Sequence, residues 1–209
     1  GRSISADINL CLLKFWLSTC VVKHESCSSK RTDSGQPEYS IDTYTRTLIR
    51  EPGAAQYAAL SYVWGGPEVP QLNLNSLKEL EPECQMWLLI KYWERLPNTV
   101  KDAIALCESL SIQQLWVYSL CILQGSRPSE SLLCDTRLAR QMFLVYREAY
   151  LTIVAAGGKD SWAGLPGFNG RTRKVNQQIV QLDRAQLSVV LPRQPEAIAS
   201  SVWNTRAWT

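Results

Sequence analysis

Two cysteines and one histidine lie close together in the sequence, at Cys20, His24 and Cys27. Thiolates and an imidazole at these spacings can bind one zinc ion, which usually takes four ligands in a structural site. Cys11 is a candidate for the fourth ligand, although its spacing does not require that role. The alternative is a helix with two buried cysteines, acting as small apolar residues, and an exposed histidine. The spacing leaves both interpretations open.

A second group of candidate residues follows a predicted strand, residues 57–64, which is apolar on both faces near its end and therefore typical of a buried central strand. Ser61, Trp64, Gly65 and Gly66 lie at its carboxyl end. Ligands of open parallel sheets bind beyond the carboxyl ends of the strands. A hydroxyl, an indole and two glycines could there hold a planar ring and let backbone amides approach phosphate oxygens. The alternative is a core tryptophan followed by a glycine turn.

Ser119 and Gln124 are the candidates at the end of the next predicted strand, residues 115–120. A histidine-based catalytic triad is not predicted, because His24 is the only histidine and is far in sequence from both strands. The sequence also has neither a Walker loop nor a GxGxxG fingerprint. Whether the chain is an enzyme therefore stays open at this stage.

Alternating strands and helices must position these side chains. The predicted elements are strands 41–51, 57–64, 115–120 and 151–156, an amphipathic helix capped by Asn98, a second helix introduced by residues 128–130, and two further strands at 178–182 and 187–191. This alternation predicts an α/β fold of three layers, with a largely parallel central sheet, right-handed crossovers and additional C-terminal strands. We expect residues 1–52 to form a small N-terminal appendage and residues 53–209 the α/β domain, cut short at its C-terminus.

Composition restricts the class of protein. Of 209 residues, 45% are hydrophobic and 20% are charged, which is typical of a globular domain. A net charge of +3 is too small to imply a nucleic-acid partner. No apolar run reaches the length of a membrane helix, so no membrane partner is expected. Seven cysteines without a tight framework favour a reducing compartment, and hence a cytoplasmic location.

Several blocks of sequence stand in a fixed order along the chain. They read YAALSYVWG at 57–65, LPNTVKDAI at 96–104, LWVYSLCILQ at 115–124, MFLVY at 142–146, TIVA at 152–155, GLPG at 164–167 and TRAWT at 205–209. Together they resemble the heterokaryon incompatibility (HET) domain of filamentous fungi. The resemblance extends from residue 57 to residue 209, and more loosely over the residues before them.

This resemblance implies a non-self recognition effector that triggers programmed cell death in fungi. It also implies control by a protein partner or an appended sensor domain that brings copies together, since clustering raises the effective concentration for a weak contact. The family pattern has aspartate where Tyr118 stands, and usually where Gly125 stands. Tyrosine and glycine cannot replace a carboxylate electrostatically, so an inactive remnant of a HET protein is a further hypothesis.

The HET domain is also distantly similar to the Toll/interleukin-1 receptor (TIR) domain, whose fold is of the same flavodoxin-like kind. Some TIR domains cleave NAD with a glutamate near the helix that follows a central strand, and that role maps onto Glu130 or Asp135. A carboxylate there could stabilise the oxocarbenium ion that develops as nicotinamide leaves. The alternative is that both carboxylates only favour the start of the helix through its dipole.

Overall fold

The computed structural model describes residues 5–28, 36–50, 52–53, 55–66, 69–72, 86–123, 132–171, 173, 177–183, 185–188 and 194–205. Within these ranges the side chains of 26, 28, 86–91, 132–139 and 194–195 lie outside the description. In the described part of the chain, no helix is both long enough and apolar enough to cross a membrane.

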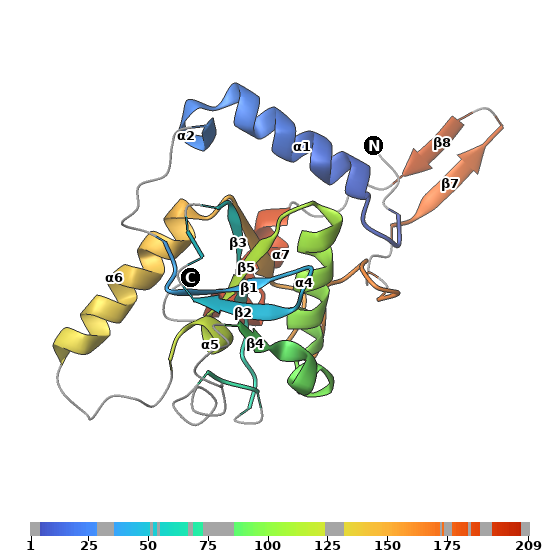
Figure 1. Ribbon diagram of the computed structural model, residues 1–209. Coiled ribbons are helices and arrows are strands. Elements are labelled where there is room, and N and C mark those ends of the chain that lie inside the picture. The colour runs from blue at the N-terminus through green and yellow to red at the C-terminus, as the bar shows by residue number, and fades with distance from the viewer. Residues whose placement is uncertain are drawn as a thin grey trace.

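The centre of the fold is a six-stranded sheet with the order β4-β2-β1-β5-β3-β6 (Figure 1). Its strands are β1 (Tyr39–Asp42), β2 (Thr47–Arg50), β3 (Tyr57–Tyr62), β4 (Met86–Leu88), β5 (Gln114–Val117) and β6 (Leu151–Ala155). Strand β3 is parallel to both β5 and β6, whereas β4, β2, β1 and β5 pair antiparallel. The predicted α/β class is confirmed, and its parallel part is β5-β3-β6.

Strand β3 lies between β5 and β6, and all six of its residues are buried. Helices α4 (Asn98–Ser109) and α6 (Leu132–Glu148) lie on opposite sides of the sheet (Figure 1), which gives the three layers. Two tyrosines fasten α6 to β3: the Tyr57 hydroxyl donates to the Val145 carbonyl at 2.6 Å, and the Tyr146 hydroxyl donates to the Leu60 carbonyl at 3.1 Å. The Trp116 ring meets the Tyr146 ring edge-on, 5.3 Å between centroids.

The prediction of one strand over residues 41–51 is wrong, because this segment contains a hairpin of two strands. Strand β1 ends at Asp42, and β2 begins at Thr47 with the two residues paired. The Asp42 carboxylate accepts the backbone N–H groups of Tyr44 and Thr45, both at 2.9 Å, and Arg46 adopts a φ of 55°. The Asp42 side chain thus stabilises the turn, which contains no glycine that would have indicated a turn in the sequence. Both strands precede residue 53, yet they belong to the central sheet.

The start of α4 and the end of β5 also differ from the prediction. Helix α4 begins at Asn98, but Pro97 is the capping residue, and the Asn98 amide instead donates to the Trp162 carbonyl at 2.8 Å. Strand β5 stops at Val117, where the short helix α5 (Tyr118–Cys121) replaces the predicted end of the strand. Asn98 therefore fastens the loop that follows β6.

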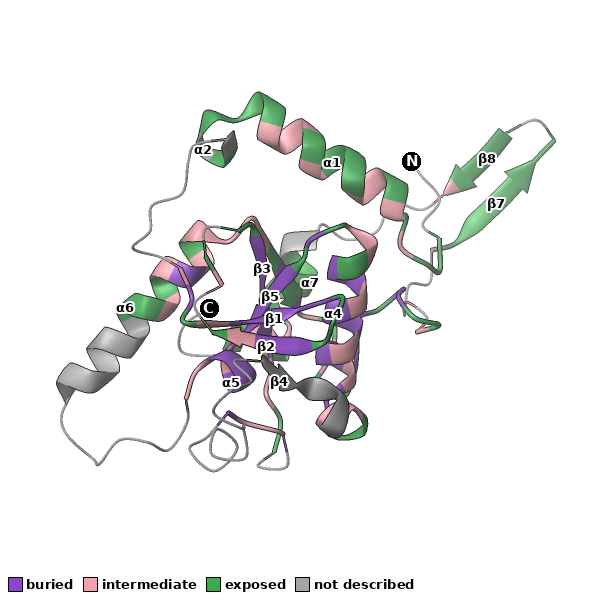
Figure 2. Cartoon of the chain, in the orientation of Figure 1, coloured by how far each residue is buried: buried purple, intermediate pink, exposed green. Residues whose placement is uncertain are grey.

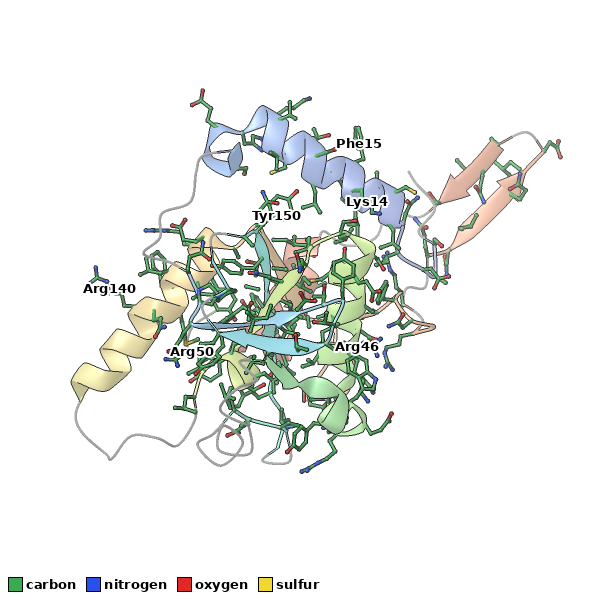
Figure 3. All side chains as sticks on the ribbon, viewed as in Figure 1. Lys14, Phe15, Arg46, Arg50, Arg140 and Tyr150 are labelled. Atoms are coloured by element: carbon green, nitrogen blue, oxygen red, sulfur yellow. The ribbon has the colours of Figure 1, made fainter. Side chains whose placement is uncertain are left out.

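Helix α1 (Leu10–Lys23) is followed by the short helix α2 (Glu25–Ser28). A half-buried stripe runs along α1 through Leu10, Leu13, Leu17 and Cys20, at the spacing of one helix face. Lys14 and Phe15, labelled in Figure 3, are exposed, the Phe15 side chain by 63%. The backbone N–H of Ile8 donates to the Gly167 carbonyl at 2.8 Å, so the start of α1 is tied to the loop after β6.

The remaining elements are η2 (Leu89–Arg95), β7 (Ile179–Leu182), β8 (Ala185–Ser188), α7 (Gln194–Ala199) and η3 (Val202–Thr205). Strands β7 and β8 form a separate antiparallel hairpin and do not join the central sheet. The hairpin projects from the body (Figure 1), and its strands are coloured almost wholly as exposed in Figure 2, in contrast to β3 and β5. The first predicted C-terminal strand, 178–182, is observed as β7. The second, 187–191, overlaps β8, which begins two residues earlier, and residues 189–191 lie outside the described residues.

Candidate functional site

Aromatic rings meet at the carboxyl ends of β3 and β5. Trp64 follows β3, and its ring lies 4.9 Å from the ring of Tyr118, the first residue of α5. Tyr118 also meets Trp116 edge-on, with 6.3 Å between ring centroids. The predicted ligand-binding indole is thus packed against Tyr118.

The two hydroxyls predicted at these strand ends are hydrogen-bonded within the protein. Ser61 accepts the indole N–H of Trp203 at 2.9 Å, from the distant segment η3. The Ser119 and Tyr62 hydroxyl oxygens are 2.9 Å apart and buried. These contacts join β3 to α5 and to the C-terminal segment, so both serines hold the strand ends together.

Gly65 and Gly66 have different surroundings. Gly65 has a φ of +90°, and a Cβ added there would lie 3.3 Å from the Asp160 Cβ. The positive φ and the close approach of the loop after β6 both favour glycine at position 65. A Cβ added at Gly66 would meet nothing within 4 Å. The open side of this turn lies at Gly66.

A buried carboxylate, missed by the sequence prediction, fastens α4 to the loop after β6. Asp102 accepts the backbone N–H of Leu165 at 2.9 Å, the Asn169 amide at 3.0 Å and the Arg171 guanidinium at 2.6 Å. Its side chain is only 2% exposed, and that of Arg171 is 33% exposed. A buried carboxylate is tolerated only when it is paired and hydrogen-bonded, and Asp102 meets both conditions. We call this group the Asp102 anchor.

Two further contacts extend the Asp102 anchor along the first turns of α4. The Thr99 hydroxyl accepts the backbone N–H of Gly164 at 3.1 Å, and the Thr99 N–H donates to the Ser161 carbonyl at 3.0 Å. Gly164 has a φ of +74°, and an added Cβ would collide with the side chains of Arg171 and Asp102. The blocks LPNTVKDAI and GLPG of the sequence therefore meet in space.

A cavity of about 290 Å³ lies beside the Asp102 anchor. Its charged lining consists of Arg46, Lys101 and Arg171 together with Asp102 and Glu108, which leaves one cationic side chain in excess. The Arg46 guanidinium, at the turn between β1 and β2, lies 4.2 Å from the centroid of the Trp93 ring. Figure 3 labels Arg46 beside α4. An excess of cationic side chains around one cavity favours anionic groups over cationic ones.

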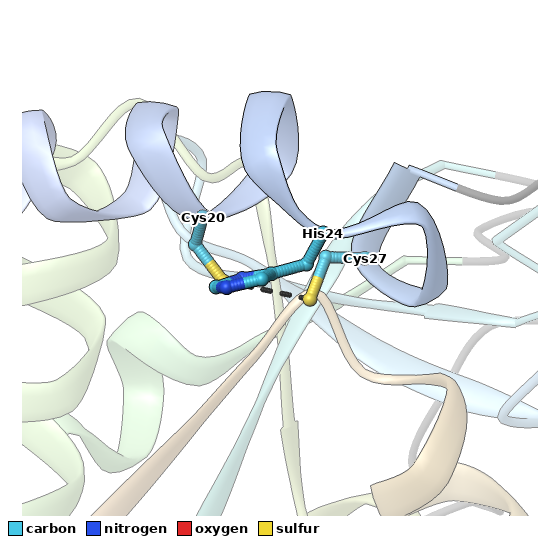
Figure 4. Close-up of side chains that lie close together, drawn as sticks. All are labelled: Cys20, His24 and Cys27. Atoms are coloured by element: carbon cyan, nitrogen blue, oxygen red, sulfur yellow. Dashed lines mark hydrogen bonds between the residues drawn. The ribbon is translucent and has the colours of Figure 1, made fainter.

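Cys20, His24 and Cys27 come together at the junction of α1 and α2 (Figure 4). The Cys20 sulfur lies 3.4 Å from Nδ1 of His24 and 3.4 Å from the Cys27 sulfur. The hydrogen bond to Cys27, followed by partial burial and the charge of Cys27, raises the pKa of the Cys20 thiol. The raised pKa favours the thiol form of Cys20 over its thiolate.

The side chains of the remaining predicted site residues lie outside the described part of the structure. Gln124 and Glu130 lie outside the described residues, and so does the side chain of Asp135, whose backbone belongs to the first turn of α6. The structure therefore brings together Ser61, Trp64 and Ser119 at the strand ends, and the Cys/His group elsewhere.

The comparison with protein families gives one finding. The family model described as heterokaryon incompatibility protein (HET) matches residues 57–209, which includes both the strand ends and the Asp102 anchor. No curated protein and no solved structure matches the chain.

Proposed function

Because the chain belongs to the heterokaryon incompatibility (HET) family, whose model matches residues 57–209, we propose that it is an effector domain of fungal non-self recognition. In this role it triggers programmed cell death when a partner or an appended sensor activates it. The family match is the observation that carries the proposal. The effector works in the cytoplasm, as the free cysteines favour.

The proposed effector acts through contact between protein copies. The strand-end hydroxyls support this reading, since Ser61 and Ser119 are engaged with Trp203 and Tyr62. The single histidine lies in the Cys/His group on α1 and α2, outside the sheet. A histidine that could act as general base is therefore not placed beside either serine.

The β7–β8 hairpin supplies the surface for that contact. Val180 pairs with Leu187 across the hairpin, and Leu182 pairs with Ala185, so the apolar side chains of these residues share one face. Val180, Leu182 and Leu187 are 55%, 49% and 57% exposed. A second copy of the same hairpin is the occupant we propose, because an exposed strand edge can pair with its own copy while the apolar faces cover one another.

Viability of a filamentous fungus after induced expression of the chain tests the proposal. The unmodified chain is expected to kill, whereas a Val180→Lys/Leu187→Lys variant is expected to be harmless and monomeric. Gln181→Lys is the matched control, since Gln181 lies in the same strand on the other face of the hairpin and is also exposed. This control should kill as the unmodified chain does.

Other outcomes would redirect the proposal. Killing by the Val180→Lys/Leu187→Lys variant at the normal rate would reject the hairpin contact. Death that requires Tyr118→Asp would show that the natural chain is an inactive remnant. NAD cleavage would be indicated by nicotinamide release that disappears in Glu130→Gln or Asp135→Asn. The effector role would be rejected if the natural chain is harmless, Tyr118→Asp does not restore killing and no nicotinamide is released.

A further inference from the structure

The group formed by Cys20, His24 and Cys27 has no part in the proposed effector function and lies outside the family match. Its three potential ligand atoms all lie within 4.8 Å of one another. Two soft sulfurs and one imidazole nitrogen are the donor set that zinc prefers over magnesium or calcium. The question is whether the geometry suits a metal ion or merely reflects sequence proximity.

The distances between the donor atoms suit a single tetrahedral ion. With Zn–S bonds of about 2.3 Å and Zn–N bonds of about 2.0 Å, tetrahedral angles place donor atoms about 3.5–3.8 Å apart. The observed separations from the Cys20 sulfur are 3.4 Å to the Cys27 sulfur and 3.4 Å to His24 Nδ1. These two separations are a few tenths of an ångström below the tetrahedral values, and all three ligand atoms lie within 4.8 Å of one another, so a movement of about 1 Å or less would complete the coordination.

The backbone explains why the three side chains converge. Cys20 is in the last turn of α1, and His24 caps this helix, with its N–H donating to the Cys20 carbonyl at 3.0 Å. The extended conformation of His24, with φ −119° and ψ 113°, turns the chain into α2. The Cys27 N–H then donates to the His24 carbonyl at 2.9 Å. This bend directs the Cys27 sulfur back toward Cys20, as Figure 4 shows.

We infer that Cys20, His24 and Cys27 bind one zinc ion, which fixes the bend between α1 and α2. In the isolated chain a water molecule fills the fourth position. The sequence-based suggestion of Cys11 as fourth ligand is wrong, because Cys11 precedes Cys20 by nine residues in the same helix, about 13.5 Å along its axis. Cys20 lies on the half-buried stripe of α1, whereas Cys11 is exposed.

The rival interpretation of the same geometry is a Cys20–Cys27 disulfide. Two thiols that approach to 3.4 Å can also be oxidised to a disulfide by a small-molecule oxidant or another disulfide, with release of two protons and two electrons. A disulfide would leave His24 without a role and would prevent metal binding. The test must therefore begin with fully reduced protein.

The full 209-residue chain, reduced and freed of metal by a chelator, is titrated with zinc and examined by native mass spectrometry. A parallel titration with cobalt reports tetrahedral thiolate ligation through its visible absorption. Cys27→Ser and His24→Ala remove one proposed ligand each, whereas Cys11→Ser is the matched control, an exposed cysteine of the same helix. We expect one zinc per chain, retained in Cys11→Ser and weakened at least about 100-fold in the two ligand variants.

Thiol alkylation followed by peptide mapping gives a second readout. Zinc should slow the alkylation of Cys20 and Cys27 without changing that of Cys11. The inference is overturned if the reduced chain binds no zinc, or if the affinity is unchanged in both ligand variants. It is also overturned if zinc leaves the alkylation of Cys20 and Cys27 unchanged. Because viability of a fungal host plays no part in these measurements, their failure is distinct from failure of the proposed function.

Discussion

The Asp102→Ala substitution should destabilise the protein by removing the carboxylate that joins α4 to the loop after β6. The variant loses three hydrogen bonds, from Leu165, Asn169 and Arg171. Removing one partner of a buried ion pair costs about 3–5 kcal/mol. The lower end applies here, because the Arg171 side chain is 33% exposed and regains water. We expect a loss of about 3 kcal/mol, which lowers Tm by about 6–12 °C in a chain of this size.

Urea unfolding followed by tryptophan fluorescence measures this loss, and the sequence provides eight tryptophans as probes. Glu108→Ala is the matched control, because Glu108 is an exposed acidic residue of the same helix. It should change the free energy of unfolding by less than about 0.5 kcal/mol. The Asp102→Ala/Arg171→Ala double variant should lose less than the sum of the single variants, since the two residues form one pair. A change below about 1 kcal/mol in Asp102→Ala would refute the reasoning.

Three other predictions concern single residues. Burial disfavours the charged form of Asp42, but hydrogen bonds from Thr45, Gln113 and Tyr44 outweigh it and lower its pKa. The stability that the Asp42 carboxylate provides is therefore present above its unfolded pKa of about 3.9 and is lost as the pH falls through the folded pKa. Urea titrations below about pH 4 should therefore show a shrinking difference in stability between the natural chain and Asp42→Asn. Burial raises the pKa of the Cys107 and Cys121 thiols to about 12, so mass spectrometry should find both unmodified by iodoacetamide at pH 8 until the protein unfolds. Tyr118→Asp should cost about 0.5–1.5 kcal/mol through loss of the ring contact with Trp64, measurable by urea unfolding, and an unchanged stability would contradict the packing role.

The sequence was sufficient to predict the parallel part of the fold. Strand β3 lies in a mostly apolar run that is followed by Gly65 and Gly66, and α4 has an apolar face at helical spacing. These signals are local, and each points to one kind of element. The hairpin of β1 and β2 was missed because its turn is organised by the Asp42 carboxylate, which can be recognised only once Tyr44 and Thr45 present their N–H groups to it.

The candidate site was less predictable, because its contacts join residues far apart in the chain. The Asp102 anchor depends on Leu165, Asn169 and Arg171, more than sixty positions away. Trp203 reaches Ser61 across an even longer separation. By contrast, Cys20, His24 and Cys27 were found from spacing alone, because one helix end and one bend bring them together. Spacing indicates a site when the local backbone determines the geometry, and fails when tertiary packing does.

Tyr118 connects the fold to the proposed function. The resemblance to the HET domain implies aspartate at this position, but the Tyr118 ring contacts the rings of Trp64 and Trp116 at the carboxyl ends of the strands. The strand ends therefore remain closely packed without a carboxylate at this position. Tyr118 cannot supply a carboxylate to a reaction that needs one at this position, whereas the β7–β8 hairpin is a separate two-stranded sheet. An effector that acts by contact can tolerate this substitution, and an enzyme that depends on this carboxylate cannot.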